Sequence, residues 1–225
     1  MRSRFFLAGL SKIIFSCALL VYISPGVDGF AADFRLFETR HFTVLYREDL
    51  SGKDLDGVKD ALEGMYETMA REFGEVVKRP VSVVIFGETG DFTYHTKLPP
   101  WSASAMIDGN IYLQPYRVLK KRGVETTTLR HEVALVFLYH LSGKKSITPW
   151  LAEGLAVYYS GEIGSIRSGL SGDPPSVRNP DDINAYLTDH TDPEKNRWGY
   201  VLAYEEVKRL LKEGEKYGVM RFLAQ

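Results

Sequence analysis

The sequence has 225 residues, with 28 Lys and Arg against 29 Asp and Glu, and this length suits one domain, or two small ones, around a hydrophobic core. Hydrophobic residues make up 44% and charged residues 25%, which excludes wholesale disorder. The formal net charge of −1 gives no compositional reason to expect nucleic-acid or membrane-surface binding.

The N-terminal segment has the pattern of a secretory signal peptide. Basic residues precede an apolar run over residues 13–23, and a Ser-Pro-Gly break and small residues follow up to Ala32. The alternative is an uncleaved anchor helix, but the run is shorter than the ~20 residues that span a bilayer. We predict a signal peptide over residues 1–32 and an exported domain over residues 33–225, periplasmic or secreted, with no stable membrane span after cleavage. The single cysteine, Cys17, is removed with the signal peptide, so the mature chain forms no disulfide.

The first half of the mature chain predicts strands around one long helix. Residues 41–46 and 81–86 are rich in the β-branched and aromatic residues that strands favour. Between them, residues 53–74 repeat apolar side chains at helical spacing, which predicts an amphipathic helix. The apolar positions of this helix are Val58, Leu62, Met65, Met69 and Phe73. Two short strands, 103–107 and 110–114, flank an Asp-Gly pair, which predicts a tight hairpin.

The second half predicts helices. Residues 125–141 form one, and Thr148-Pro149 opens another that ends at Ser160, with Thr as the N-cap and Pro at the first helical position. Residues 161–182 are rich in Gly, Ser, Pro and Asp without periodicity, which predicts a functional rim or a disordered segment. The basic run 120–122 is interpreted as a solvated turn. Further helical regions are expected over residues 198–213 and 217–224. This order predicts an α+β fold, with a sheet first and a helical half after it.

One short motif carries the chemistry. A zinc peptidase helix contains His-Glu-x-x-His, because residues four apart share a helix face, where two imidazoles meet one metal and the glutamate acts as a base on the bound water. Here His131 and Glu132 occupy the first two positions, but Leu135 stands where the second histidine would be. His140 does not replace it, because nine positions after His131 it points to the other side of the helix.

The motif and its surroundings resemble the gluzincin metallopeptidases, specifically the compact bacterial peptidases of the MA-like domain type. In that family a second helix reads Trp-Leu-x-Glu-Gly-x-Ala, and its glutamate is the third zinc ligand. The same pattern stands here at residues 150–156, so the resemblance assigns that role to Glu153. The resemblance covers about residues 40–215. It implies a thermolysin-like fold with an N-terminal mixed sheet and long helix, an active-site helix and a helical C-terminal half.

Two further segments carry the resemblance. Gly109–Leu113 is similar to the strand that lies along the substrate in this family. Residues 198–204 are similar to the helix that often supplies a tyrosine to the tetrahedral intermediate, and Tyr200 is the candidate for that role. The alternative for Tyr200, and for Tyr204, is an ordinary core aromatic.

The substitution at Leu135 limits the expected zinc site. His131 and Glu153 would give zinc two protein ligands, whereas catalytic zinc has three and a water. We therefore expect zinc binding to be weak or absent. Glu132 and Glu153 are alternatively buried carboxylates left from an ancestral site and hydrogen-bonded to His131. Residues with suitable donors elsewhere, although their spacing does not argue for them, are His95, His190 and Asp108.

Three functions fit these observations. The leading hypothesis is an exported pseudoenzyme with a degenerate zinc site, which binds a peptide or a protein partner in the ancestral cleft without cutting it. The first alternative is an active zinc peptidase that uses His131, Glu153 and an unidentified third ligand, with Glu132 as the general base. The third is a structural or assembly module of the cell envelope in which the cleft has no role.

Overall fold

The computed structural model describes residues 34–212, except residues 48 and 146. The expected signal peptide over residues 1–32 and the expected helix over residues 217–224 lie outside the described residues. Among the helices of the described part, none is both long and apolar enough to cross a membrane.

Five strands of the described chain form one mixed sheet in the order β1-β2-β3-β5-β4. They are β1 (Arg35–Glu38), β2 (Phe42–Tyr46), β3 (Val81–Ile85), β4 (Ser104–Ile107) and β5 (Asn110–Leu113). The central strand β3 is parallel to both neighbours, whereas β1 and β4 are antiparallel and form the two edges. Four of the strands confirm the prediction within one or two residues. The strand β1 was missed because most of its residues are exposed and it lacks an alternating apolar pattern.

The turn between β4 and β5 is the predicted two-residue hairpin. Asp108 has φ 52° and Gly109 has φ 78°, the pair of positive values that a type I′ turn requires. Glycine is also needed for space, because a Cβ at position 109 would lie 3.0 Å from the ring of Tyr139. The hairpin turn therefore packs tightly against Tyr139 in the helix over residues 125–141.

The long helix α1 (Gly52–Phe73) forms where the apolar repeat predicted it. Its N-terminus is closed by a capping box, in which the Asp54 N–H donates to the Ser51 hydroxyl while the Asp54 carboxylate accepts from the Ser51 backbone. Four of the five predicted core positions are buried, namely Val58, Leu62, Met65 and Met69. Phe73 is half-buried and packs edge-on against Tyr159.

Two predicted helices of the second half are confirmed, as α4 (Glu125–Leu141) and α5 (Pro149–Ser160). Thr148 is the N-cap of α5, but its side chain makes no capping hydrogen bond, and the Trp150 N–H donates to the Asn184 side chain instead. The last helix, α8 (Pro193–Lys212), begins five residues earlier than predicted. Its early start has a local cause, because the Asp192 carboxylate accepts from the first free N–H groups of the helix.

The short helices were not predicted. They are α2 (Thr89–Thr96), α3 (Tyr116–Arg122), α6 (Ile163–Ser168), the 3₁₀ turn η2 (Pro180–Ile183) and α7 (Asn184–Leu187). Each contains too few turns for apolar periodicity to show. Two corrections follow: the basic run 120–122 is the last turn of α3 rather than a loop, and residues 161–182 are partly helical.

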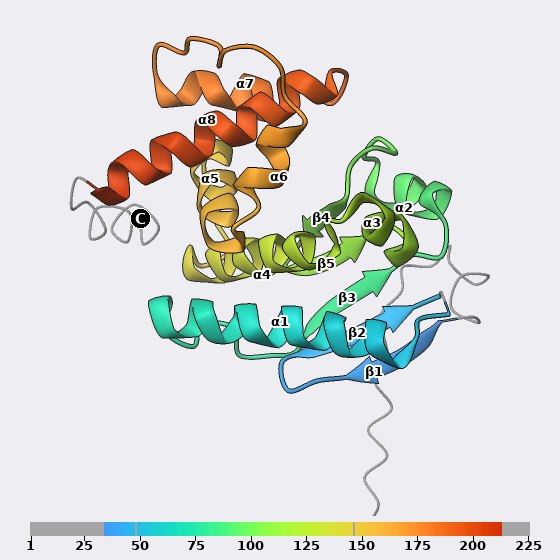
Figure 1. Cartoon of the computed structure of the whole chain (residues 1–225). Coiled ribbons are helices and arrows are strands. Elements are labelled where there is room, and N and C mark those ends of the chain that lie inside the picture. The colour runs from blue at the N-terminus through green and yellow to red at the C-terminus, as the bar shows by residue number, and fades with distance from the viewer. Residues whose placement is uncertain (1–33, 48, 146, 213–225) are drawn as a thin grey trace, which may run out of the picture. The chain divides into compact units, whose positions relative to one another are not determined.

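The arrangement confirms an α+β fold with a mixed sheet and long helix first and a mostly helical half after it. Figure 1 shows α1 and α4 side by side across the sheet, with α5 and α8 stacked beyond α4. The helices α5 and α8 approach very closely, since a Cβ at Gly154 would lie 2.4 Å from the Ala203 carbonyl oxygen. One apolar core runs from the sheet through α1 and α4 into α5 and α8.

Candidate functional site

A cleft of about 840 Å³ lies between the β4 edge of the sheet and the helical half. One wall is strand β4 together with the cleft-facing side of α4, and the other comes from α5, α6 and α8. The residues that the sequence singled out line this same cleft: His131, Glu132, Leu135, Glu153 and Tyr200. The structure therefore brings the predicted site residues together, although they come from three different helices.

His131 is held between two carboxylates. It projects from α4 and is 7% exposed. Its Nε2 lies 3.0 Å from Glu153 Oε2, where Glu153 comes from α5. Its Nδ1 makes a very short contact with Glu162 Oε1, at the start of α6. Both ring nitrogens are thus engaged, which fixes the orientation of the imidazole.

The two carboxylates favour the charged form of this histidine. Burial alone would lower the pKa of His131, but Glu162 and Glu153 outweigh the burial and raise the pKa well above its ordinary value. A protonated imidazole donates a hydrogen bond to each carboxylate, which is the arrangement that satisfies all three side chains. The result is a buried polar centre that links α4, α5 and α6.

Glu132 lies beside this centre and is only partly satisfied. The Ser104 hydroxyl of β4 donates to Glu132 Oε1 at 2.6 Å, while Oε2 is buried without a hydrogen-bond partner among the described residues. Burial raises the pKa of Glu132 to about 7, although the charge on His131 and the Ser104 hydrogen bond pull it down. A carboxyl with such a pKa can hold or release a proton near neutral pH.

Tyr200 lies beside this polar centre, whereas Tyr204 does not belong to it. The Tyr200 ring stands edge-on to His131, with 6.1 Å between ring centroids. The carboxylate of Glu153, followed by burial, raises the pKa of Tyr200 well above its ordinary value, so the phenol stays protonated. Tyr204 instead packs against Tyr158 on the adjacent helix, the arrangement of an ordinary aromatic contact.

The donors at this point do not complete a zinc site. His131 Nε2 and Glu153 Oε2 are close enough to share a metal, but the third side chain on that side of α4, Leu135, has no donor atom. Glu162 engages the opposite ring nitrogen, so it orients the histidine rather than adding a ligand beside Nε2. Within the described residues, no cluster of three or more His, Cys, Asp or Glu has the arrangement to hold a metal ion.

The distant donors are spread over the domain. His190 lines the cleft, but no hydrogen bond or ring contact joins it to His131 in the described part. His95 packs against Tyr112 and Phe86. Asp108 stands in the β4–β5 turn.

One expectation about the cleft is wrong. Gly109–Leu113 was expected to be the strand along the substrate, but β5 lies inside the sheet between β3 and β4. The free edge beside the cleft is β4. The sequence pattern marked a hairpin without showing which of its strands pairs with β3.

Sequence reasoning missed Glu162 and Ser104, both of which contact the predicted residues directly. Glu162 directly follows Gly161, the left-handed C-cap of α5, which turns the chain back toward the cleft. The glycine stop was visible in the sequence, but the direction of the returning chain was not. In the sequence Ser104 is an ordinary strand residue, and its contact with Glu132 follows only from the position of α4 beside β4.

Comparisons of this chain with protein-family models, curated proteins and solved structures found no match.

Proposed function

We propose that this chain is an exported, gluzincin-like protein with a degenerate zinc site, whose cleft binds an extended segment of a peptide or protein partner without cutting it. The proposal includes a thermolysin-like fold and an MA-like domain over residues 33–225. It is supported by one observation above all: the free edge of the sheet, β4, runs along a cleft of about 840 Å³.

The backbone of β4 supplies the binding groups. The Gln114 N–H donates to the Ala103 carbonyl, so the backbone groups of Ala103 face β5. By the alternation of an antiparallel pair, those of Ala105 and Ile107 face β5 as well. In an antiparallel pair the intervening residues direct their N–H and C=O groups away from the partner strand. Ser104 and Met106 therefore present two donors and two acceptors along the open edge. An added extended strand satisfies such groups, the mode known as β-augmentation.

The side chains support binding over hydrolysis. Leu135 adds an apolar surface to the cleft where a ligand would be required. The imidazole of His131 is occupied at both nitrogens by carboxylates. These contacts hold the wall of the cleft in place and offer no third metal donor.

A backbone-directed substitution tests the proposal. Met106→Pro removes the outward N–H while leaving the hydrogen bonds of β4 to β5 intact, a position where a strand tolerates proline. Met106→Ala removes the side chain and keeps the N–H. Binding of short labelled peptides, followed by fluorescence anisotropy, should weaken much more in Met106→Pro than in Met106→Ala. Equal binding by both variants would mean that the edge strand does not carry the peptide, and no binding by the natural chain would favour the structural-module hypothesis.

The second candidate is the active zinc peptidase, and Glu132 is the observation that favours it. This carboxyl lies in the cleft with its pKa raised to about 7, a value suited to a general base. The test is to incubate the mature chain with zinc and peptides and to analyse the products by mass spectrometry. Cleavage that disappears in Glu132→Gln would overturn the non-catalytic proposal.

A further inference from the structure

Two arginines face the cleft without acidic partners. Arg122 is the last residue of α3, and Arg197 lies in the first half of α8, and both line the cleft. In residues 34–212 as described, neither guanidinium has an ion pair or a hydrogen bond to a carboxylate. Arg197 donates only to the Gly169 carbonyl, at 3.1 Å. By contrast, other basic residues on the same helices are paired, as Lys120 is with Asp54.

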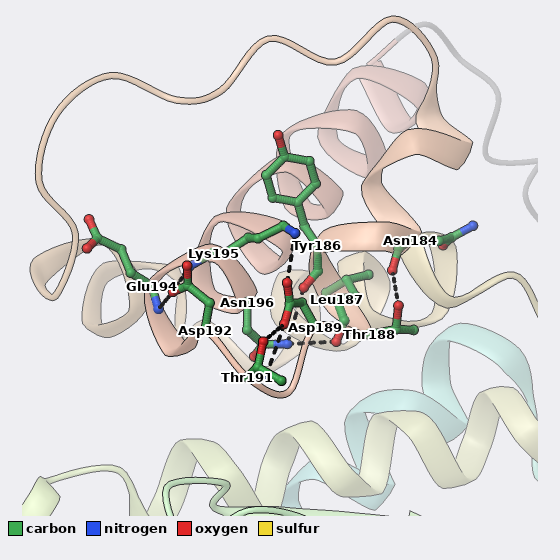
Figure 2. A network of polar contacts seen from close by, with 10 residues as sticks. All are labelled: Asn184, Tyr186, Leu187, Thr188, Asp189, Thr191, Asp192, Glu194, Lys195 and Asn196. Carbon is green, nitrogen blue, oxygen red and sulfur yellow. Dashed lines mark hydrogen bonds and ion pairs between the residues drawn. The ribbon is translucent and has the colours of Figure 1, made fainter.

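Contacts of the neighbouring residues fix the position of Arg197. Figure 2 shows the polar network that joins α7 to the start of α8, in which the Asn196 side chain donates to the Leu187 carbonyl at 2.6 Å. In the same network Lys195 pairs with Asp189 at 2.7 Å. These contacts fix the backbone on both sides of the turn. The guanidinium of Arg197 then packs directly over Gly169, where an added Cβ would lie 2.4 Å from Nη1.

The two charges act on each other. Partial burial, and then the charge of Arg197, lower the pKa of the Arg122 guanidinium, so the pair is close enough for repulsion. Both side chains are exposed at the cleft, and an anion beside both guanidinium groups would relieve the repulsion. Arginine is the side chain best suited to this, because its planar fork matches the two oxygens of a carboxylate.

The arginines also have a defined place along the cleft. Arg122 precedes α4, so it lies at the end of the cleft where α4 begins, whereas Leu135 lies beyond His131 along the same helix. Arg197 lies one helical turn before Tyr200, which contacts His131. The cleft is therefore cationic at one end and carries its carboxylates around His131. Among the described residues that line the cleft, Arg122 and Arg197 are the only arginines or lysines.

We propose that Arg122 and Arg197 together bind a carboxylate of the peptide that occupies the cleft, either an Asp or Glu side chain or the free C-terminus. The inference rests on the proposed peptide binding and adds its specificity: acidic peptides are selected, with the acidic group at the end of the cleft where α4 begins. The carboxylates around His131 exclude an acidic residue from the other part of the cleft by like-charge repulsion.

The experiment uses matched peptides and matched variants of the mature chain. Each peptide is made with Glu or Gln, and with a free or amidated C-terminus, which separates the two sources of the carboxylate. The variants are Arg122→Gln, Arg197→Gln and the double substitution, and glutamine keeps part of the side-chain length. Arg130→Gln is the control, because Arg130 is an exposed arginine of α4 that does not line the cleft.

We expect the natural chain to bind the acidic form about 10- to 100-fold more tightly than its neutral counterpart. The double substitution should abolish this preference, so that the acidic and neutral peptides bind it equally tightly, and Arg130→Gln should keep the preference. Either the Glu-to-Gln change or the amidation of the C-terminus will account for the effect, which identifies the bound group.

The outcomes distinguish the role of the two arginines from the proposed peptide binding on which it rests. Peptide binding that is sensitive to Met106→Pro but shows no acidic preference would overturn the role of the arginines and leave peptide binding standing. A complete lack of peptide binding would overturn both. Binding of inorganic phosphate to the natural chain, lost in the double substitution and without any acidic-peptide preference, would show that the arginines hold a different anion.

Discussion

The two halves of the domain bury their side chains by different means. The sheet and α1 pack their apolar side chains against each other, and a capping box closes the N-terminus of α1. The helical half encloses His131 between two carboxylates, with the buried Glu132 beside it, and packs α5 on α8 through a glycine. Apolar packing stabilises the first half without further requirements, whereas buried ionisable groups are costly unless fully partnered. The second half therefore carries a feature that stability alone does not select.

The largest expected effect tests whether the polar centre is a zinc site with one ligand missing. We expect Leu135→His to raise zinc affinity about 1,000-fold or more, which corresponds to ~4 kcal/mol. The physical reason is that a third donor joins His131 Nε2 and Glu153 Oε2 on one side of α4, with a fourth position open for water. Zinc titration by calorimetry of the natural and substituted chains measures the difference.

A control establishes that the three positions converge. Adding Glu153→Ala to the Leu135→His chain should remove most of the gained affinity, because two ligands then remain. Without metal, the single substitution should destabilise the fold modestly, since a polar ring replaces an apolar side chain. Equal and weak zinc binding by the natural and Leu135→His chains would contradict the gluzincin-like reading of the site.

The next effect concerns the apolar half. Leu62→Ala, at a fully buried position of α1, should lower the free energy of unfolding by about 2–5 kcal/mol, because it removes packed methyl groups and leaves a cavity. Leu36→Ala is the matched control on an exposed position of β1 and should change stability by less than about 0.5 kcal/mol. Urea denaturation of both variants measures the contrast, and similar values would show that α1 does not bury this face.

The polar half should respond to pH in a way that the apolar half does not. The pKa of Glu132 is about 7 in the folded chain against an ordinary 4.5, so the folded state holds one more proton between these values. Stability from this group is therefore lost as the pH rises from about 4.5 to about 7. Glu132→Gln removes the ionisation and keeps the oxygen that accepts from Ser104.

The comparison of the two chains across pH isolates this group. The free energies of unfolding should be nearly equal at pH 4.5, and Glu132→Gln should be more stable by about 3 kcal/mol at pH 8. Urea denaturation at a series of pH values measures the difference. A constant difference at all pH values would show that Glu132 is not buried as a neutral acid.

The sequence predicted features that repeat over many residues or depend on one turn. The helix α1, the Asp-Gly hairpin and the helices α4 and α5 each had such a signal. The convergence of His131, Glu132, Leu135 and Glu153 on one cleft was also predictable, because the spacing within α4 and the resemblance supplied it.

What the sequence did not predict depends on contacts between distant segments. Glu162 reaches His131 only because the chain reverses after α5, and Ser104 reaches Glu132 only because β4 is the edge strand beside α4. Arg122 belongs to a short basic run that the sequence made visible, but its place in the cleft follows from the orientation of the short helix α3. Such pairings have no local pattern, since each partner alone is an ordinary surface or strand residue.

The smallest effect compares one substitution at two helical glycines. At Gly154 a Cβ would lie 2.4 Å from the Ala203 carbonyl oxygen and 2.7 Å from a Val207 methyl group, so α5 and α8 must separate. Gly154→Ala should therefore lower the free energy of unfolding by about 1–3 kcal/mol, despite the better helix propensity of alanine. At Gly164 in α6 the space around a new Cβ is open, and Gly164→Ala should raise stability by about 0.5–1 kcal/mol through the lower entropy of the unfolded chain. Thermal denaturation of the two variants should thus shift in opposite directions. A stabilising Gly154→Ala would mean that α5 and α8 do not pack closely enough at Gly154 to exclude a methyl group.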